Sequence, residues 1–139
     1  MKFSYTLTTA ATPAAVWSTW TDVEKWPQWD SELTSARLFA PFALAAEGQL
    51  TPKKGPTSKF YLSQLDWGRS YTFTTQLPLC RLHIHRFITY GQPLRFTNEV
   101  SFEGPLAYVF KLMLGNRFQR VLPGVMKQLR AQLETTENR

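Results

Sequence analysis

The clearest pattern in the chain is a pair of alternating segments in its second half. Apolar and polar side chains alternate from Arg81 to Tyr90 and again from Leu94 to Glu103, with the period of two that is typical of a half-buried β-strand. Gly91, Gln92 and Pro93 separate the two segments and are typical of a turn. We therefore predict a β-hairpin in which Tyr90 lies opposite Leu94.

The antiparallel register of this hairpin assigns each side chain to one of two faces. One face pairs Leu82 with Phe102, Ile84 with Val100, Arg86 with Asn98 and Ile88 with Phe96, and the other pairs Arg81 with Glu103, His83 with Ser101, His85 with Glu99 and Phe87 with Thr97. The first face is apolar except for Arg86 and Asn98, so we expect it to be the inner face. A buried guanidinium is costly unless it is paired or hydrated. Arg86 must therefore meet a buried partner or face a cavity that holds water or a ligand.

The rest of the chain predicts five further strands and two short helices. Phe3, Tyr5 and Leu7 alternate with polar residues and predict a first strand. Thr12 and Pro13 are typical of a helix start, and this helix continues to Trp20. Asp22 can cap a second short helix that ends near Trp26, because Pro27 disfavours helical geometry in the residue before it. The remaining strands are expected at Ser35–Phe39, Gly48–Pro52, Lys59–Asp66 and Tyr71–Leu77.

A long helix is predicted at the C-terminal end of the chain. Gly104 and Pro105 end the sheet and open this helix, which we expect to reach about Glu134. Pro123 lacks a backbone donor and crowds the preceding turn, so we expect a kink or break between Arg120 and Gly124. The predicted core stripe of the helix is Leu106, Phe110, Met113, Phe118, Val121, Val125, Leu129 and Leu133.

This order of elements predicts an α+β fold in one domain, residues 1–139. An antiparallel sheet of about seven strands would curl, and the long C-terminal helix would lie across its concave face. The two short helices after the first strand would close one end of the space between sheet and helix.

Composition narrows the classes of function. The 139 residues suit a single core, and one cysteine, Cys80, excludes an intramolecular disulfide.

The first residues alternate instead of forming a continuous apolar segment, so we expect a cytoplasmic protein. The apolar run Leu106–Leu114 is shorter than the roughly 20 residues that span a bilayer. The net charge of +6 is spread along the chain without a nucleic-acid-binding pattern, so we expect no nucleic-acid partner and at most weak contact with a membrane surface.

Three stretches of the sequence carry a resemblance to a known family. They are Ala14-Ala15-Val16-Trp17, Trp26-Pro27-Gln28-Trp29-Asp30 and Ser101-Phe102-Glu103-Gly104-Pro105-Leu106. With them the chain resembles the START-like (SRPBCC) superfamily, and within it the bacterial polyketide cyclase/dehydrase and lipid transport group, over nearly its whole length. The resemblance implies a helix-grip fold with a deep cavity for apolar or aromatic small molecules. Transport and sensing are common roles in this superfamily, and aromatic cyclases catalyse reactions in the same cavity.

Together these observations predict a binding site for a hydrophobic or aromatic small molecule between sheet and C-terminal helix. Arg86 and Asn98 would hold a carboxylate, phenolate or enolate at the polar end of the ligand. The residues expected to line the space are Phe73, Thr75, Leu82, Ile84, Ile88, Phe96, Val100, Phe110, Met113 and Val121. Either a monomer or a homodimer is compatible with such a site.

The sequence is compatible with several alternatives. Arg86 can instead bridge to a backbone carbonyl, or to a carboxylate such as Glu47 or Asp66. A cyclase or dehydratase would use Arg86 to polarise a carbonyl, although the catalytic residues are not identified. A cationic module that binds a membrane or a protein is a third class. The tryptophans of the short helices can form either core or an aromatic end of the cavity.

We expect no cofactor and no metal. His83 and His85 have a spacing that can chelate zinc, but they fall on the outward face of the hairpin, where His85 and Glu99 form an ordinary cross-strand pair. Cys80 lacks an evident histidine and carboxylate relay, and the chain has no G-x-S-x-G motif.

Overall fold

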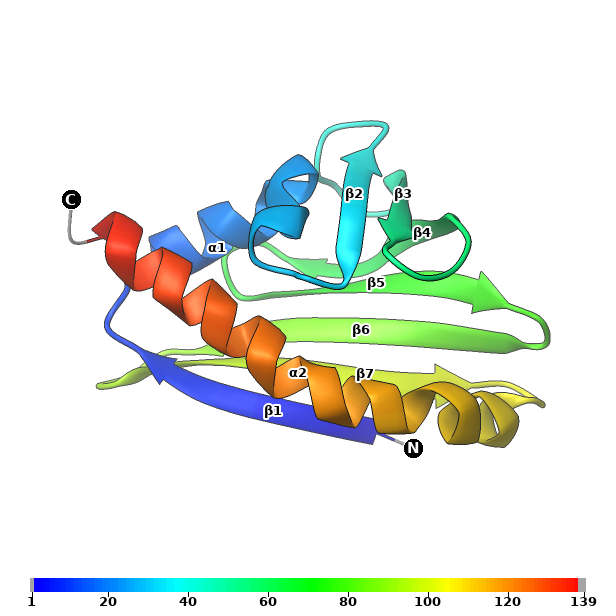
Figure 1. The fold of residues 1–139 in the computed structure, drawn as a ribbon. Coiled ribbons are helices and arrows are strands. Elements are labelled where there is room, and N and C mark those ends of the chain that lie inside the picture. The colour runs from blue at the N-terminus through cyan, green and yellow to red at the C-terminus, as the bar shows by residue number, and fades with distance from the viewer. Residues whose placement is uncertain (1, 138–139) are drawn as a thin grey trace.

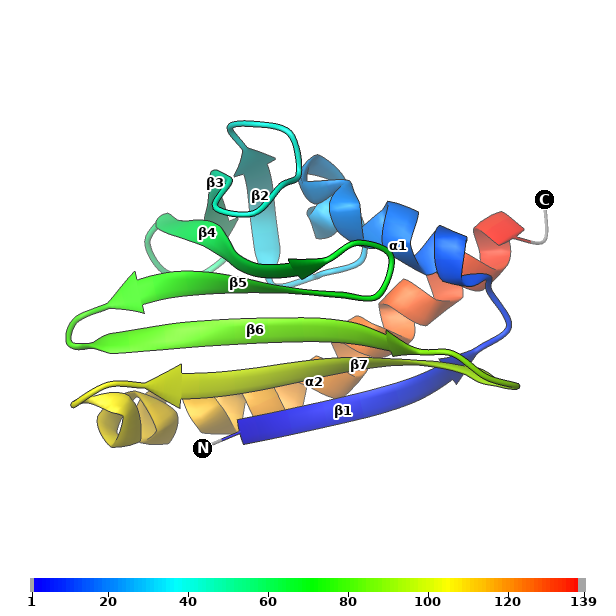
Figure 2. The same ribbon diagram turned by 180° about the vertical axis from the view of Figure 1, so that it is seen from behind.

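An antiparallel sheet of seven strands forms one layer of the molecule, and the helices cover one of its faces (Figures 1 and 2). This computed structural model describes residues 2–137. The strands are β1 (Lys2–Thr9), β2 (Leu33–Leu38), β3 (Glu47–Pro52), β4 (Ser58–Asp66), β5 (Ser70–Leu77), β6 (Cys80–Thr89) and β7 (Leu94–Glu103). They lie in the order β1-β7-β6-β5-β4-β3-β2. The helices are α1 (Pro13–Thr21), the 3-10 helix η1 (Val23–Gln28) and α2 (Ala107–Glu137).

The predicted hairpin is confirmed in register, β7 has its predicted bounds, and β6 begins and ends one residue before its predicted bounds. All of the cross-strand pairs expected between β6 and β7 are present, including Arg86 with Asn98 and His85 with Glu99. The face that carries Ile84, Ile88 and Phe96 is buried, so the assignment of the inner face is also confirmed. The other strands lie within two residues of their predicted bounds.

The two short helices follow the first strand as expected, with one difference at their junction. Thr12 caps α1, because its Oγ1 accepts a hydrogen bond from the backbone N–H of Ala15 at 3.1 Å. Asp22 makes no capping hydrogen bond to η1, so the expectation of an aspartate cap is wrong. The 3-10 helix also continues through Pro27 to Gln28, two residues beyond the predicted end.

The C-terminal helix begins at Ala107, after Pro105, and ends at Glu137, three residues beyond its predicted end. It differs from its prediction in two further respects. It remains helical through Pro123, so no break divides it. Met113 is 66% exposed and does not belong to the buried stripe. The sheet-facing residues instead follow a spacing of four, the helical period that keeps side chains on one side, namely Phe110, Leu114, Phe118, Leu122 and Met126, with Val125, Leu129 and Leu133 completing the buried C-terminal half.

The concave face of the sheet is covered in two parts. The helix α2 packs against β1, β7 and β6, whereas η1 packs against β2. Trp20 of α1, Trp26 of η1 and Trp29 directly after η1 are each at most 1% exposed. The indoles of Trp20 and Trp26 pack against Tyr71 and that of Trp26 also against Phe73, whereas Trp29 packs against Trp26. The tryptophan cluster is therefore core.

Gly48 in β3 provides a direct test of how tightly the far end of the sheet is packed. A Cβ atom at Gly48 would lie 2.3 Å from the carbonyl oxygen of Arg37 and 2.6 Å from the ring of Phe60. We expect Gly48→Ala to lower the free energy of unfolding by about 1–3 kcal/mol or more through overpacking. The matched control is Gly124→Ala in α2, where a Cβ would meet nothing within 4 Å, and which we expect to raise stability by up to about 1 kcal/mol. Chemical denaturation measures both, and equal effects would contradict the packing.

Candidate functional site

Arg86 lies in the middle of β6 on the concave face of the sheet and is 4% exposed. Its register neighbours are Tyr71 in β5 and Asn98 in β7. Nη1 of Arg86 donates a hydrogen bond of 2.6 Å to the phenolic oxygen of Tyr71. The sheet therefore fixes the cation between a phenol and an amide.

Four aromatic rings surround the guanidinium. Its central carbon lies 4.7 Å from the ring centroid of Trp26, 5.0 Å from those of Trp29 and Phe73, and 5.8 Å from that of Tyr71. Electron-rich ring faces at these distances attract a cation. The indole of Trp26 is held in place, because its Nε1 donates to the carbonyl oxygen of Trp20 at 2.9 Å. We expected an open hollow in front of Arg86, and the structure shows a cage of rings there instead.

Within residues 2–137 no carboxylate lies within ion-pair distance of Arg86. The partners considered from the sequence, Glu47 and Asp66, are exposed and do not pair with it. Asp30, directly after Trp29, lies close enough to Arg86 for the guanidinium charge to influence the pKa of its carboxyl. Burial raises the pKa of the Asp30 carboxyl, while a hydrogen bond from the backbone N–H of Glu32 and the charge of Arg86 act in the opposite direction.

Several buried polar atoms around this cluster have no hydrogen-bond partner among the described residues. They are Nε of Arg86, Oδ1 of Asn98 and the indole Nε1 atoms of Trp17 and Trp29. Most buried polar atoms in proteins are satisfied, and an unsatisfied one is destabilising. Nε of Arg86 is one such donor, and the guanidinium lies 5.0 Å from the ring centroid of Trp29, whose Nε1 is another. An oxygen acceptor such as a carboxylate, phenolate or carbonyl at this place would satisfy the Arg86 donor.

The structure brings most of the predicted lining residues together. Phe73, Thr75, Ile84, Ile88, Phe96, Asn98 and Val100 are buried, whereas Leu82, Phe110 and Val121 are half-buried. All of the strand residues in this set lie on the same face of β5, β6 and β7 as Arg86. Met113, by contrast, points away from the core and is not placed to line a space between sheet and helix.

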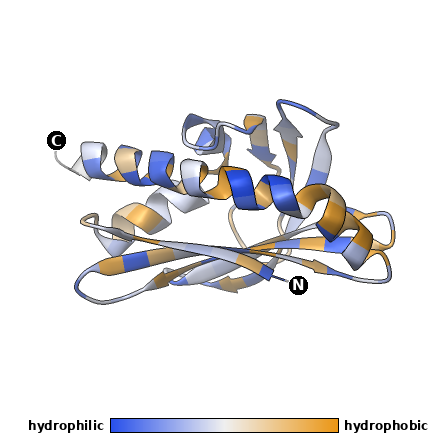
Figure 3. Cartoon of the chain, turned by 60° about the horizontal axis from the view of Figure 1, so that its bottom comes forward, coloured by the Kyte–Doolittle hydropathy of each residue, from blue (hydrophilic) through white to orange (hydrophobic). Residues whose placement is uncertain are grey.

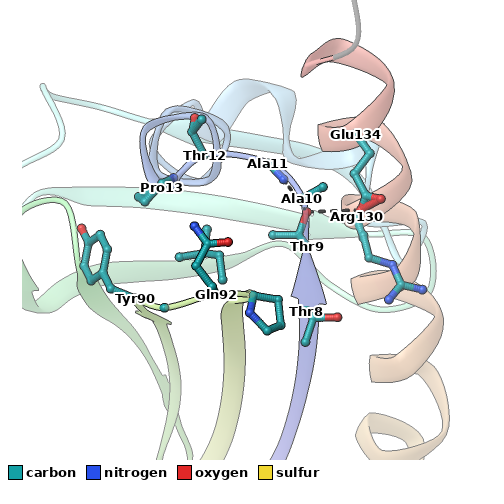
Figure 4. A pocket seen from close by; sticks show the side chains of 13 residues that line it. Thr8, Thr9, Ala10, Ala11, Thr12, Pro13, Tyr90, Gln92, Arg130 and Glu134 are labelled. Atoms are coloured by element: carbon teal, nitrogen blue, oxygen red, sulfur yellow. Dashed lines mark hydrogen bonds between the residues drawn. The ribbon is translucent and has the colours of Figure 1, made fainter.

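A cleft of about 740 Å³ opens at one end of the sheet (Figure 4). It lies between the end of β1, the start of α1, the β6–β7 turn and the last turns of α2, with Thr12, Gln92, Arg130 and Glu134 on its walls. Thr9 closes the floor, because its hydroxyl donates to Glu134 at 3.2 Å and accepts from the backbone N–H of Ala11 at 3.1 Å.

This cleft was not predicted, since its walls come from four separate segments of the chain. A smaller cavity of about 280 Å³ lies between β1 and α2. None of the residues predicted to bind ligand lines either cavity.

The outer face of the sheet carries the two histidines. Nδ1 of His83 hydrogen-bonds the hydroxyl of Thr74, and Nδ1 of His85 that of Thr72, both at 2.7 Å. Among the described residues no three metal-ligating side chains converge. Cys80 is buried in the core, and burial raises the pKa of its thiol, which disfavours the nucleophilic thiolate.

Comparisons with known proteins agree with this architecture. A family model described as polyketide cyclase/dehydrase and lipid transport matches residues 1–134. No curated protein matches the chain. The chain is similar in structure to a START superfamily protein from Mycobacterium smegmatis, with a TM-score of 0.71, 17% identity, and 97% of this chain and 98% of that chain covered.

Two further solved structures show the same fold. The di-domain ARO/CYC StfQ from the steffimycin biosynthetic pathway has a TM-score of 0.76 and 15% identity; the match covers 99% of this chain and 52% of StfQ, so this chain spans about half of it. A protein from Mesorhizobium loti has a TM-score of 0.77 and 14% identity, with 98% of both chains covered. These likenesses confirm the predicted helix-grip, START-like fold.

The energetic role of Arg86 can be tested with a double-mutant cycle. Tyr71→Phe removes the hydrogen bond to a buried cation, so we expect it to lower the free energy of unfolding by about 1–3 kcal/mol. Arg86→Met keeps an apolar stem without the charge, and we expect it to leave stability unchanged or to increase it. Tyr71→Phe combined with Arg86→Met should then be more stable than Tyr71→Phe alone. Urea denaturation checks the cycle. Additive effects would show that Tyr71 and Arg86 are not coupled, and a large loss of stability in Arg86→Met alone would show that the cation is a structural requirement.

The raised pKa of Asp30 has a predictable effect on stability. A carboxyl that holds its proton more tightly in the folded state stabilises that state below the unfolded pKa of 3.8, and this contribution is lost as pH rises through the higher folded pKa. We expect the wild type to lose stability relative to Asp30→Asn as pH increases across this window. Urea denaturation at a series of pH values measures the difference, and parallel curves would contradict the assignment.

Proposed function

Because the chain belongs to the polyketide cyclase/dehydrase and lipid transport family, we propose that it binds a hydrophobic or aromatic small molecule with an anionic or carbonyl oxygen at one end. The observation that carries this proposal is Arg86, a buried cation with no carboxylate within ion-pair distance among the described residues and with an Nε donor that has no acceptor there. Transport, sequestration or sensing would each use such a site. We expect the protein to be located in the cytoplasm.

A ligand oxygen would complete the hydrogen bonding that the protein leaves incomplete. It would accept from Nε of Arg86, while the amide of Asn98 can orient a neighbouring polar group. Hydrogen bonds to charged groups are about twice as strong as neutral ones. The apolar body of the ligand would lie on the concave face, with Phe73, Ile84 and Val100 contributing shape, and with Thr75, Leu82, Ile88, Phe96, Phe110 and Val121 around them.

Binding at this place requires the ring cage to open. Trp26 and Trp29 come from η1 and its end, and 3-10 helices have poorer hydrogen-bond geometry than α-helices. The cleft at the end of the sheet offers a route, because Leu94 on its wall lies on the same strand face as Phe96 and Asn98. From Leu94 to Asn98 the distance along the strand is about 13 Å at roughly 3.3 Å per residue. We propose that a ligand enters there and displaces the indoles from the guanidinium.

A cyclase-type enzyme is the second candidate, favoured by the contact between Arg86 and Tyr71. Burial raises the pKa of Tyr71, against the opposing effect of Arg86, so the phenol keeps its proton at neutral pH. A phenol and a guanidinium can together polarise a substrate carbonyl. In that case Tyr71→Phe would lower turnover while binding persists.

The binding proposal predicts selectivity for an anionic ligand. We expect the wild type to bind 2-naphthoate more tightly than the uncharged 2-naphthamide, and Arg86→Met to lose roughly 10- to 150-fold in affinity for naphthoate, because a hydrogen bond to a charged group contributes about 1.5–3 kcal/mol. Quenching of tryptophan fluorescence or calorimetry measures both ligands.

Arg130→Met is the matched control, since Arg130 is the cation on the wall of the open cleft. It should keep the selectivity for naphthoate. If Arg130→Met abolishes the selectivity and Arg86→Met does not, the anion binds in the cleft and the proposal for Arg86 is wrong.

A further inference from the structure

Exposed apolar side chains gather at the N-terminal end of α2. Tyr108, Val109, Leu112 and Met113 are between 45% and 66% exposed. Their spacing of one, three and four residues places them on one side of the helix, opposite the side that faces the sheet. Figure 3 shows the first turns of α2 as an apolar segment, followed by hydrophilic positions along the helix. Together with Leu79, described next, we call these residues the apolar tip.

Leu79 in the β5–β6 turn is a further exposed apolar residue, next to the start of α2. It is 64% exposed and has a φ of 50°, a backbone conformation that is unfavourable for a residue with a branched side chain. Its carbonyl oxygen accepts a hydrogen bond from the backbone N–H of Leu106 at 3.0 Å. Gly104, at a φ of 120°, permits this approach, because a Cβ there would lie 2.8 Å from the same oxygen. The turn is therefore fixed against the start of α2, at one end of the molecule (Figures 1 and 2).

A row of positive charge follows the apolar tip along the helix. Between Glu103 and Glu134 the sequence contains no acidic residue, whereas Lys111, Arg117, Arg120, Lys127 and Arg130 are basic. Arg120 and Lys127 are exposed, and Arg117 pairs with Glu32. An apolar segment that continues into a basic one is complementary to a membrane with anionic headgroups.

We propose that the apolar tip inserts into the interface of an anionic lipid membrane, with Arg120 and Lys127 on the headgroups. No helix among residues 2–137 is long and apolar enough to cross a bilayer, so the contact is one of the surface. The exposed apolar side chains followed by exposed basic ones favour insertion into lipid with anionic headgroups over a protein partner. The proposal does not depend on the identity of any ligand.

Sedimentation with vesicles tests the docking surface. We expect the wild type to bind vesicles of phosphatidylcholine mixed with phosphatidylglycerol, and to bind phosphatidylcholine alone more weakly. Leu112→Ser combined with Met113→Ser should reduce binding to the mixed vesicles by at least about tenfold, because two apolar side chains no longer leave water. Arg120→Gln combined with Lys127→Gln should reduce it by about fivefold for each charge and should weaken its dependence on salt.

Leu44→Ser is the matched control, because Leu44 is 62% exposed but lies in the β2–β3 loop. It should bind like the wild type. Equal binding of the Leu112→Ser, Met113→Ser variant, or an equal loss in Leu44→Ser, would overturn the proposal. A wild-type dimer in solution that the tip variant dissociates would also overturn it, because the surface would then belong to a second copy of the chain.

A second measurement does not depend on loss of binding. An environment-sensitive dye attached at Met113→Cys should shift its emission to shorter wavelength when mixed vesicles are added, and the same dye at Leu44→Cys should not. Cys80 is buried, so it does not compete for the label. No shift at position 113 in protein that sediments with the vesicles would place another surface on the membrane and overturn the proposal.

Discussion

The concave face of this sheet holds a full positive charge whose principal neighbours are aromatic rings. Arg86 has one side-chain hydrogen bond, to Tyr71 at 2.6 Å, and no carboxylate within ion-pair distance in the described part of the chain. Cation–π contacts contribute about 0.5–2 kcal/mol each, which offsets only part of the several kcal/mol that burying an ion costs. An apolar residue at this position would fill the same core without the free-energy cost of burying an ion. This cost is the reason why we propose a role for Arg86 in ligand binding.

The surrounding strands and helices keep the Arg86 side chain away from solvent. Strands β5, β6 and β7 place Tyr71, Arg86 and Asn98 side by side in register. The helix α2 packs against β1, β7 and β6, whereas aromatic side chains of α1 and η1 cover Tyr71 and Phe73 of β5. The short helix then brings Trp26 and Trp29 over the guanidinium. A ligand of the family's kind would have to replace those indoles, and the cost of moving them would set a limit on its affinity.

The sequence was sufficient to predict the fold and the position of Arg86 on the inner face, but not the residues that surround its side chain. Period-two alternation fixes which residues of a hairpin share a face, and therefore the pairing of Arg86 with Asn98 followed from local pattern alone. Tyr71 and the tryptophans contact Arg86 across separate elements, and no spacing in the sequence encodes such a contact. Met113 was misplaced for a related reason. Successive apolar residues in α2 allow more than one buried stripe, and the packing of Leu114 and Phe118 against the sheet selects one of them.

The most direct test of the central claim is the NMR signal of the Arg86 side chain. Its Nε–H group has no hydrogen-bond acceptor among the described residues, so an oxygen of a bound ligand should change its environment more than that of any other arginine. Titration of 15N-labelled protein with 2-naphthoate should shift this resonance downfield and slow its exchange with water. If naphthoate binds and the Arg86 resonance does not move, the buried cation is not the ligand's partner.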